Sequence, residues 1–162
     1  MPRLILRSLL IAAFLLSGER CCFASNKILE TRFATIHYAD DQEINDLFWR
    51  ISGKRLLLTG QTEMIKNRLD ELVERVEQAL EMYPPSLHFG VELRAHYVSG
   101  AIAEYFHRTK AITVSLDRVT DGVLAHEMAH AVICAYFPVP PPEKAQEILA
   151  QYVDKHLYEE PI

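Results

Sequence analysis

Two histidines and a glutamate lie within an otherwise apolar stretch of this chain, residues 123–133 (VLAHEMAHAVI). Apolar residues surround the three polar ones on nearly every side, which is typical of a helix buried at the centre of a domain. Burying imidazole and carboxylate groups costs free energy unless these groups have partners. The stretch therefore predicts a central helix in which His126, Glu127 and His130 have polar or ionic partners.

The spacing within residues 126–130 indicates that a metal ion is the partner of the two histidines. Residues four apart on a helix point from the same face, so His126 and His130 can offer two imidazole nitrogens to one tetrahedral zinc ion. Glu127 lies one step round the helix, close enough to reach a zinc-bound water without being a ligand. Zinc makes such a water acidic and polarises a carbonyl, while a carboxylate can collect the proton and pass it to a leaving amine. We therefore expect a zinc-dependent peptidase that hydrolyses peptide bonds, with Glu127 as general base.

A catalytic zinc site also needs a third protein ligand and an open fourth position. The downstream candidates are Glu143, Glu147, Asp154 and His156. The proline-rich residues 138–142 end the first helix and begin a second. Glu147 falls one turn into that second helix, next to its apolar side, whereas Glu143 lies at its frayed start. Glu147 is therefore the predicted third ligand.

Two downstream side chains, Tyr152 and His156, are candidates for a donor to the oxyanion of the tetrahedral intermediate. Such a donor would stabilise the negative charge that develops on the oxygen. Cys134, two turns after His126, is expected to pack as a small apolar residue.

Residues 126–132 (HEMAHAV), followed after a turn by residues 146–153 (QEILAQYV), resemble the gluzincin zinc metallopeptidases, and in particular the small peptidase-MA-like domains. The resemblance implies zinc on His126, His130 and Glu147, with Glu127 as base. It implies an α+β fold of the minimal zincin-like type, in which a small mixed sheet has an edge strand packed on the HExxH helix and a ligand-bearing helix follows. It also implies that strand 111–116 is that exposed edge, along which an extended peptide substrate pairs.

The chain departs from the family pattern at two positions. Ile148 replaces the usual glycine after the third ligand. Gln151 stands one turn after Glu147, where related enzymes often place a carboxylate that orients a ligand histidine. An amide oxygen can accept the same hydrogen bond, although it raises the basicity of the imidazole less. We therefore expect zinc binding to survive the change to Gln151.

The rest of the chain alternates predicted strands and helices. Hydrophobic periodicity and turn residues mark the boundaries. The expected elements are a strand at 32–38, a helix from Asp40 to Gly53, a long helix from Thr62 to Tyr83, a strand at 87–98, a short helix or turn at 99–107, a strand at 111–116, and two helices separated by residues 138–142.

The N-terminal residues form a separate predicted segment. Arg3 and Arg7 precede the apolar residues 9–16, which are too few to span a bilayer, and small residues follow near Ala24. This pattern predicts a signal peptide at residues 1–24 and a mature domain at residues 25–162. We therefore expect export to the periplasm or the extracellular space, with no stable membrane anchor after cleavage.

Composition limits the possible partners. The chain has 17 basic and 22 acidic residues, and without residues 1–24 it has 14 and 21, a formal charge of -7. An acidic domain lacks the cationic surplus that displaces counterions from phosphates, so nucleic acid is not expected as a partner. The expected partner is a peptide or protein substrate. The alternative from another class is an exported zinc-binding protein with a structural or partner-binding role and no peptidase activity.

Overall fold

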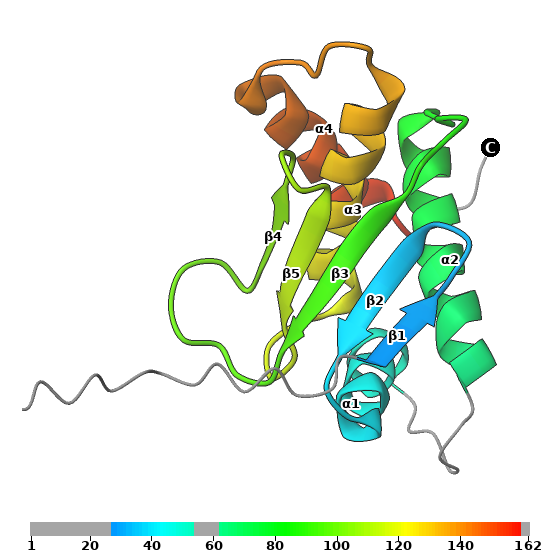
Figure 1. Cartoon of the computed structure of the whole chain (residues 1–162). Helices are drawn as coiled ribbons and strands as arrows, with labels where there is room; N and C mark the ends of the chain where they lie inside the picture. The colour runs from blue at the N-terminus through cyan, green and yellow to red at the C-terminus, as the bar shows by residue number, and fades with distance from the viewer. Residues whose placement is uncertain (1–26, 54–61, 160–162) are drawn as a thin grey trace, which may run out of the picture.

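The chain forms a mixed sheet and a set of helices in the computed structural model of Figure 1, which describes residues 27–53 and 62–159. These residues contain five strands and four helices. Their order is β1 (Lys27–Glu30), β2 (Ala34–Tyr38), α1 (Asp41–Ser52), α2 (Thr62–Leu80), β3 (Phe89–Arg94), β4 (Ala103–Phe106), β5 (Ala111–Ser115), α3 (Asp121–Tyr136) and α4 (Glu143–His156). The α+β class expected from the sequence is confirmed.

The sheet has the strand order β1-β2-β3-β5-β4. Its three central strands run parallel, and the strand at each edge is antiparallel to its neighbour. Side chains of successive strand residues point to opposite faces. Ile36, Val91 and Ile112 are fully buried under the helices, whereas Glu92 and Glu104 on the opposite face are exposed. The helices α2, α3 and α4 accordingly lie behind the sheet in Figure 1.

The exposed edge nearest to the HExxH helix is β4, and the expectation that residues 111–116 form it is wrong. β5 pairs with β3 on one side and with β4 on the other, so its backbone groups are used within the sheet. Residues 99–107, expected as a short helix or turn, contain the four-residue strand β4. A strand this short carries little periodicity of its own, and pairing with β5 determines its conformation. The same reason explains why β1 was not predicted.

Local signals place both ends of α1 correctly, whereas the strand expected at 87–98 is shorter, since β3 spans Phe89–Arg94. Asp40 caps α1, because its side chain accepts hydrogen bonds from the backbone of Gln42 and Glu43. Gly53 ends the helix in the left-handed conformation that favours glycine, with φ of 67°. The helix α2 ends at Leu80, three residues earlier than expected.

The helix α3 is the centre of the helical layer. Thr120 caps its start by accepting a hydrogen bond from the backbone N–H of Val123, at 3.2 Å. Leu124, Ala125, Met128 and Ala129 are fully buried, as expected for a helix that packs against other elements along most of its surface. His126 and His130 therefore extend from successive turns of a well-packed helix.

The predicted signal peptide lies outside the described residues. Within residues 27–53 and 62–159, no helix combines the length and the apolar character that crossing a membrane requires.

Candidate metal centre

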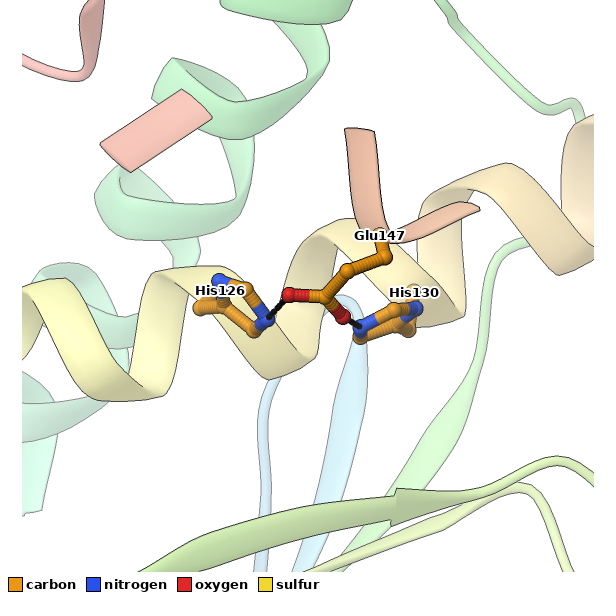
Figure 2. A group of neighbouring side chains, drawn as sticks. All are labelled: His126, His130 and Glu147. Carbon is orange, nitrogen blue, oxygen red and sulfur yellow. Dashed lines mark ion pairs between the residues drawn. The ribbon is translucent and has the colours of Figure 1, made fainter. Parts of the chain in front are cut away.

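Three predicted ligands meet where α4 crosses α3. His126 and His130 stand one turn apart on α3, and their ring centroids lie 5.2 Å apart. Glu147 reaches them from α4 (Figure 2). Its Oε1 lies 3.6 Å from Nε2 of His126, and its Oε2 lies 3.6 Å from Nε2 of His130. One nitrogen or oxygen from each residue falls within 4.8 Å of the other two, so the three side chains could hold one metal ion.

The other candidates for the third ligand occupy different positions. Glu143 is exposed in the first turn of α4. His156 lies at the far end of the helix, where its Nδ1 contacts Glu159 at 2.5 Å. The choice of Glu147 over these two therefore agrees with the geometry.

The remaining candidate, Asp154, contacts His126 on the side of the ring that faces away from Glu147. Its Oδ2 and Oδ1 lie 3.0 and 3.2 Å from Nδ1 of His126. A carboxylate only accepts hydrogen bonds, so this contact requires a proton on Nδ1 and leaves a lone pair on Nε2. Asp154 thus turns the Nε2 lone pair of His126 toward Glu147, as carboxylates do behind metal-binding histidines.

His130 has a polar partner behind it as well. Oε1 of Gln146 lies 3.4 Å from Nδ1 of His130, and the same oxygen accepts from Sγ of Cys134 at 3.4 Å. The orientation of the amide is fixed at its other end, where Nε2 donates to the carbonyl oxygen of Pro141 at 2.8 Å. Gln146 therefore presents its oxygen to the imidazole, which favours a proton on Nδ1 and a lone pair on Nε2.

This donor set fits a divalent cation such as zinc. With both Nδ1 atoms protonated, two nitrogen lone pairs and two carboxylate oxygens face one another across 3.6 Å. Lone pairs at this separation repel unless a proton or a cation lies among them. Two imidazoles and one carboxylate are also the ligands of a known class of catalytic zinc site. The side chains of the two histidines are 20% and 15% exposed and that of Glu147 is 45% exposed, so the site opens to solvent.

The predicted role of Gln151 is wrong. Its Nε2 donates to Oε1 of Glu147 at 3.1 Å, so Gln151 contacts this carboxylate and not a histidine. Asp154 holds His126 instead, from seven residues after Glu147. Seven residues are close to two helical turns, so this spacing in the sequence could have identified Asp154 as a residue on the same face. Tyr105, whose backbone N–H donates to Glu127, could not have been found this way, because residues 99–107 were not expected to contain a strand.

Glu127 lies beside the three candidate ligands and accepts a hydrogen bond from the edge strand. Its Oε2 accepts a hydrogen bond of 2.7 Å from the backbone N–H of Tyr105 in β4. Burial raises the pKa of Glu127, and this hydrogen bond and the nearby His126 only partly oppose the rise. A carboxyl group with a raised pKa binds a proton more readily near neutral pH than an ordinary glutamate, which suits a general base that must later act as an acid.

The pKa of His130 is shifted in the opposite direction to that of Glu127. Burial lowers the pKa of His130, and the neighbouring His126 lowers it further. The neutral imidazole, whose lone pair can bind a cation, therefore persists at more acidic pH than in an ordinary histidine.

A hollow of about 370 Å³ adjoins the site. It is lined by Gly122, Val123, His126, Glu127 and Asp154. The two candidate oxyanion donors, Tyr152 and His156, line a different hollow, of about 730 Å³, between α2 and the end of α4. Their rings stack on each other with centroids 4.0 Å apart. The structure therefore does not bring them to His126, His130 and Glu147.

Comparison with known proteins gives no assignment for this site. The chain matches no protein-family model, no curated protein and no solved structure.

Removing the carboxylate behind His126 is expected to weaken zinc binding without removing a ligand. In Asp154→Asn an amide replaces the carboxylate, so the imidazole loses basicity and its orientation loosens. We expect the zinc affinity to fall about 10- to 100-fold. Competition with a fluorescent chelator measures this change. Glu143→Gln, which removes a charge from the same helix away from the histidines, should retain the wild-type affinity. Equal affinities of both variants would show that Asp154 does not support the ligand.

Proposed function

We propose that this protein is a zinc-dependent peptidase similar to the gluzincins, with a zincin-like arrangement of its sheet, HExxH helix and ligand helix. The observation that carries the proposal is the convergence of two imidazole nitrogens and a carboxylate, with a further, half-buried glutamate beside them. His126, His130 and Glu147 would hold the metal, and Glu127 would act as the general base.

The way the edge strand is used supports the zincin-like arrangement. β4 lies at the exposed edge, and its Tyr105 reaches Glu127 on α3. The HExxH helix is thereby joined to the edge strand, as the resemblance implies, although the strand is β4 and not residues 111–116. We place the extended peptide substrate along this edge, because strand addition can satisfy the outward-facing backbone groups of β4 other than the Tyr105 N–H, which donates to Glu127.

The chemistry follows from the positions of the residues. Zinc, when bound, would lower the pKa of a water molecule and polarise the carbonyl group of the substrate. Glu127 would take one proton from the attacking water, as a carbon–oxygen bond forms at the substrate carbonyl. It would then give this proton to the amine nitrogen as the carbon–nitrogen bond breaks. The hydrogen bond from Tyr105 occupies Oε2 of Glu127, so Oε1 is the oxygen we assign to this proton transfer.

An exported zinc-binding protein without peptidase activity is the alternative. A structural zinc site is closed by four protein ligands. Here three side chains converge next to a hollow that Glu127 also lines, which leaves room for water and substrate. This observation favours the peptidase. Export remains a proposal that depends on the N-terminal sequence pattern.

Removing the metal tests the proposal directly. We expect protein purified without added zinc to carry one zinc ion per chain, as measured by mass spectrometry of the metal. It should cleave members of a mixed peptide library, lose cleavage after chelation, and regain it with zinc. A hydroxamate should inhibit by binding the metal at its open position. Bound zinc without cleavage and without hydroxamate binding would instead support the structural alternative, and protein without metal would exclude both.

A further inference from the structure

The pairing of β4 with β5 determines which backbone N–H and C=O groups of β4 point away from the sheet. In antiparallel pairing, alternate residues point their N–H and C=O groups toward the neighbouring strand. The carbonyl of Ile102 accepts from the N–H of Ser115, and the register pairs Glu104 with Thr113. Residues 102, 104 and 106 therefore face β5, and Tyr105 directs its N–H away from the sheet.

This outward N–H of Tyr105 is used by Glu127. The N–H donates to Oε2 at 2.7 Å, a length typical of a hydrogen bond to a charged acceptor. Such bonds are about twice as strong as neutral ones and fix the direction of the acceptor. Glu127 extends from α3 into the hollow beside His126, so a hydrogen bond from β4 determines where in that hollow its carboxylate lies.

We propose that the backbone amide of Tyr105 is a positioning group that holds the carboxylate of Glu127 in place for proton transfer. This inference depends on the peptidase function proposed above. The edge strand then has two roles, because it orients the general base from the same edge at which we place the substrate. The side chain of Tyr105 has no part in this role. Its ring points to the opposite side of the strand backbone from Glu104 and packs against the hydrophobic core.

Two substitutions at position 105 separate the amide from the ring. Tyr105→Pro and Tyr105→Ala both remove the ring, but only proline also removes the N–H. Proline is tolerated at an edge strand where the lost N–H points out of the sheet, so the ladder with β5 keeps its hydrogen bonds. We expect kcat of Tyr105→Pro to be about 100-fold below that of Tyr105→Ala, the loss typical of a misplaced catalytic group, with similar KM and zinc content. Ala103→Pro, at the other outward-facing position of β4, controls for the effect of a proline on folding, and its thermal midpoint and zinc content should match those of Tyr105→Pro.

A second measurement needs neither activity nor a proline. The amide proton of Tyr105 should resonate downfield in the zinc-free wild-type protein and move upfield in Glu127→Ala, whereas the amide proton of Glu104, which faces β5, should stay in place. An unchanged Tyr105 resonance, or equal kcat values of Tyr105→Pro and Tyr105→Ala, would overturn the inference and leave the peptidase function intact. A wild-type protein that binds zinc and cleaves no peptide would overturn the proposed function itself.

Discussion

Glu147→Ala is expected to lose most of its bound zinc. The substitution removes both carboxylate oxygens that face the imidazole nitrogens of His126 and His130 at 3.6 Å. Two histidines on one helix remain, and they cannot complete the three-ligand set of a catalytic zinc site. Loss of a group that only supports a ligand costs about 10- to 100-fold in affinity, so loss of a ligand should cost more than about 100-fold. Metal content after dialysis against a zinc buffer measures the effect.

The stability of the same variant separates metal loss from misfolding. Glu147 is 45% exposed, and substitutions at such positions usually change stability by less than about 0.5 kcal/mol. Without zinc, the thermal midpoints of Glu147→Ala and wild type should therefore be close. Zinc should raise the midpoint of the wild type, because a ligand that binds only the folded state stabilises it, and should not raise that of the variant. Glu143→Ala is the matched control on the same helix. Normal zinc occupancy in Glu147→Ala would move the third ligand to Glu143 or Asp154.

Glu127→Gln is expected to abolish most peptide cleavage while the zinc stays bound. The amide keeps the size of the side chain and can still accept the hydrogen bond from Tyr105, but it cannot take up a proton near neutral pH. General-base catalysis contributes about 10²- to 10⁴-fold, so kcat should fall within that range. Zinc content should be unchanged, because Glu127 is not among the three converging ligands.

The control for this loss is Glu104→Gln. Glu104 lies on β4, next to Tyr105 in the sequence, and its carboxylate is exposed on the face of the sheet opposite the helices. Its charge acts on Glu127. The control changes the local charge by the same amount without touching the proposed base, so its kcat should stay close to that of the wild type. Retained zinc and unchanged cleavage in Glu127→Gln would refute the role of Glu127.

The predictable part of the site is the part that depends on local spacing. The four-residue interval between His126 and His130 places both on one face of any helix, and the apolar residues around them place that helix in the core. Glu147 was also predictable, because the proline-rich turn at residues 138–142 forces the chain back and brings the next helix past the first. Helix ends at Asp40 and Gly53 were predictable for the same local reason.

The pairing of each supporting residue with its partner depends on contacts between segments far apart in the chain, although local spacing can place Asp154 on the same face of its helix as Glu147. Asp154 and His126 are 28 residues apart, and which carboxylate of α4 stands behind the imidazole depends on the angle and register at which α4 crosses α3. The interpretation of Gln151 assumed the spacing of related enzymes and was therefore wrong. Likewise, whether residues 111–116 form an edge depends on whether another strand pairs beyond them, and β4 does.

By itself the sequence determined the α+β class, the central apolar helix and the three side chains that could bind a metal, because hydrophobic period and residue spacing act within a few turns of chain. Only the tertiary structure decided which strand is exposed, which side chains hold the imidazoles from behind, and that a backbone amide of β4 holds Glu127. These features follow from hydrogen bonds between segments about 15 to 30 residues apart, which form only when the sheet and the helices have packed.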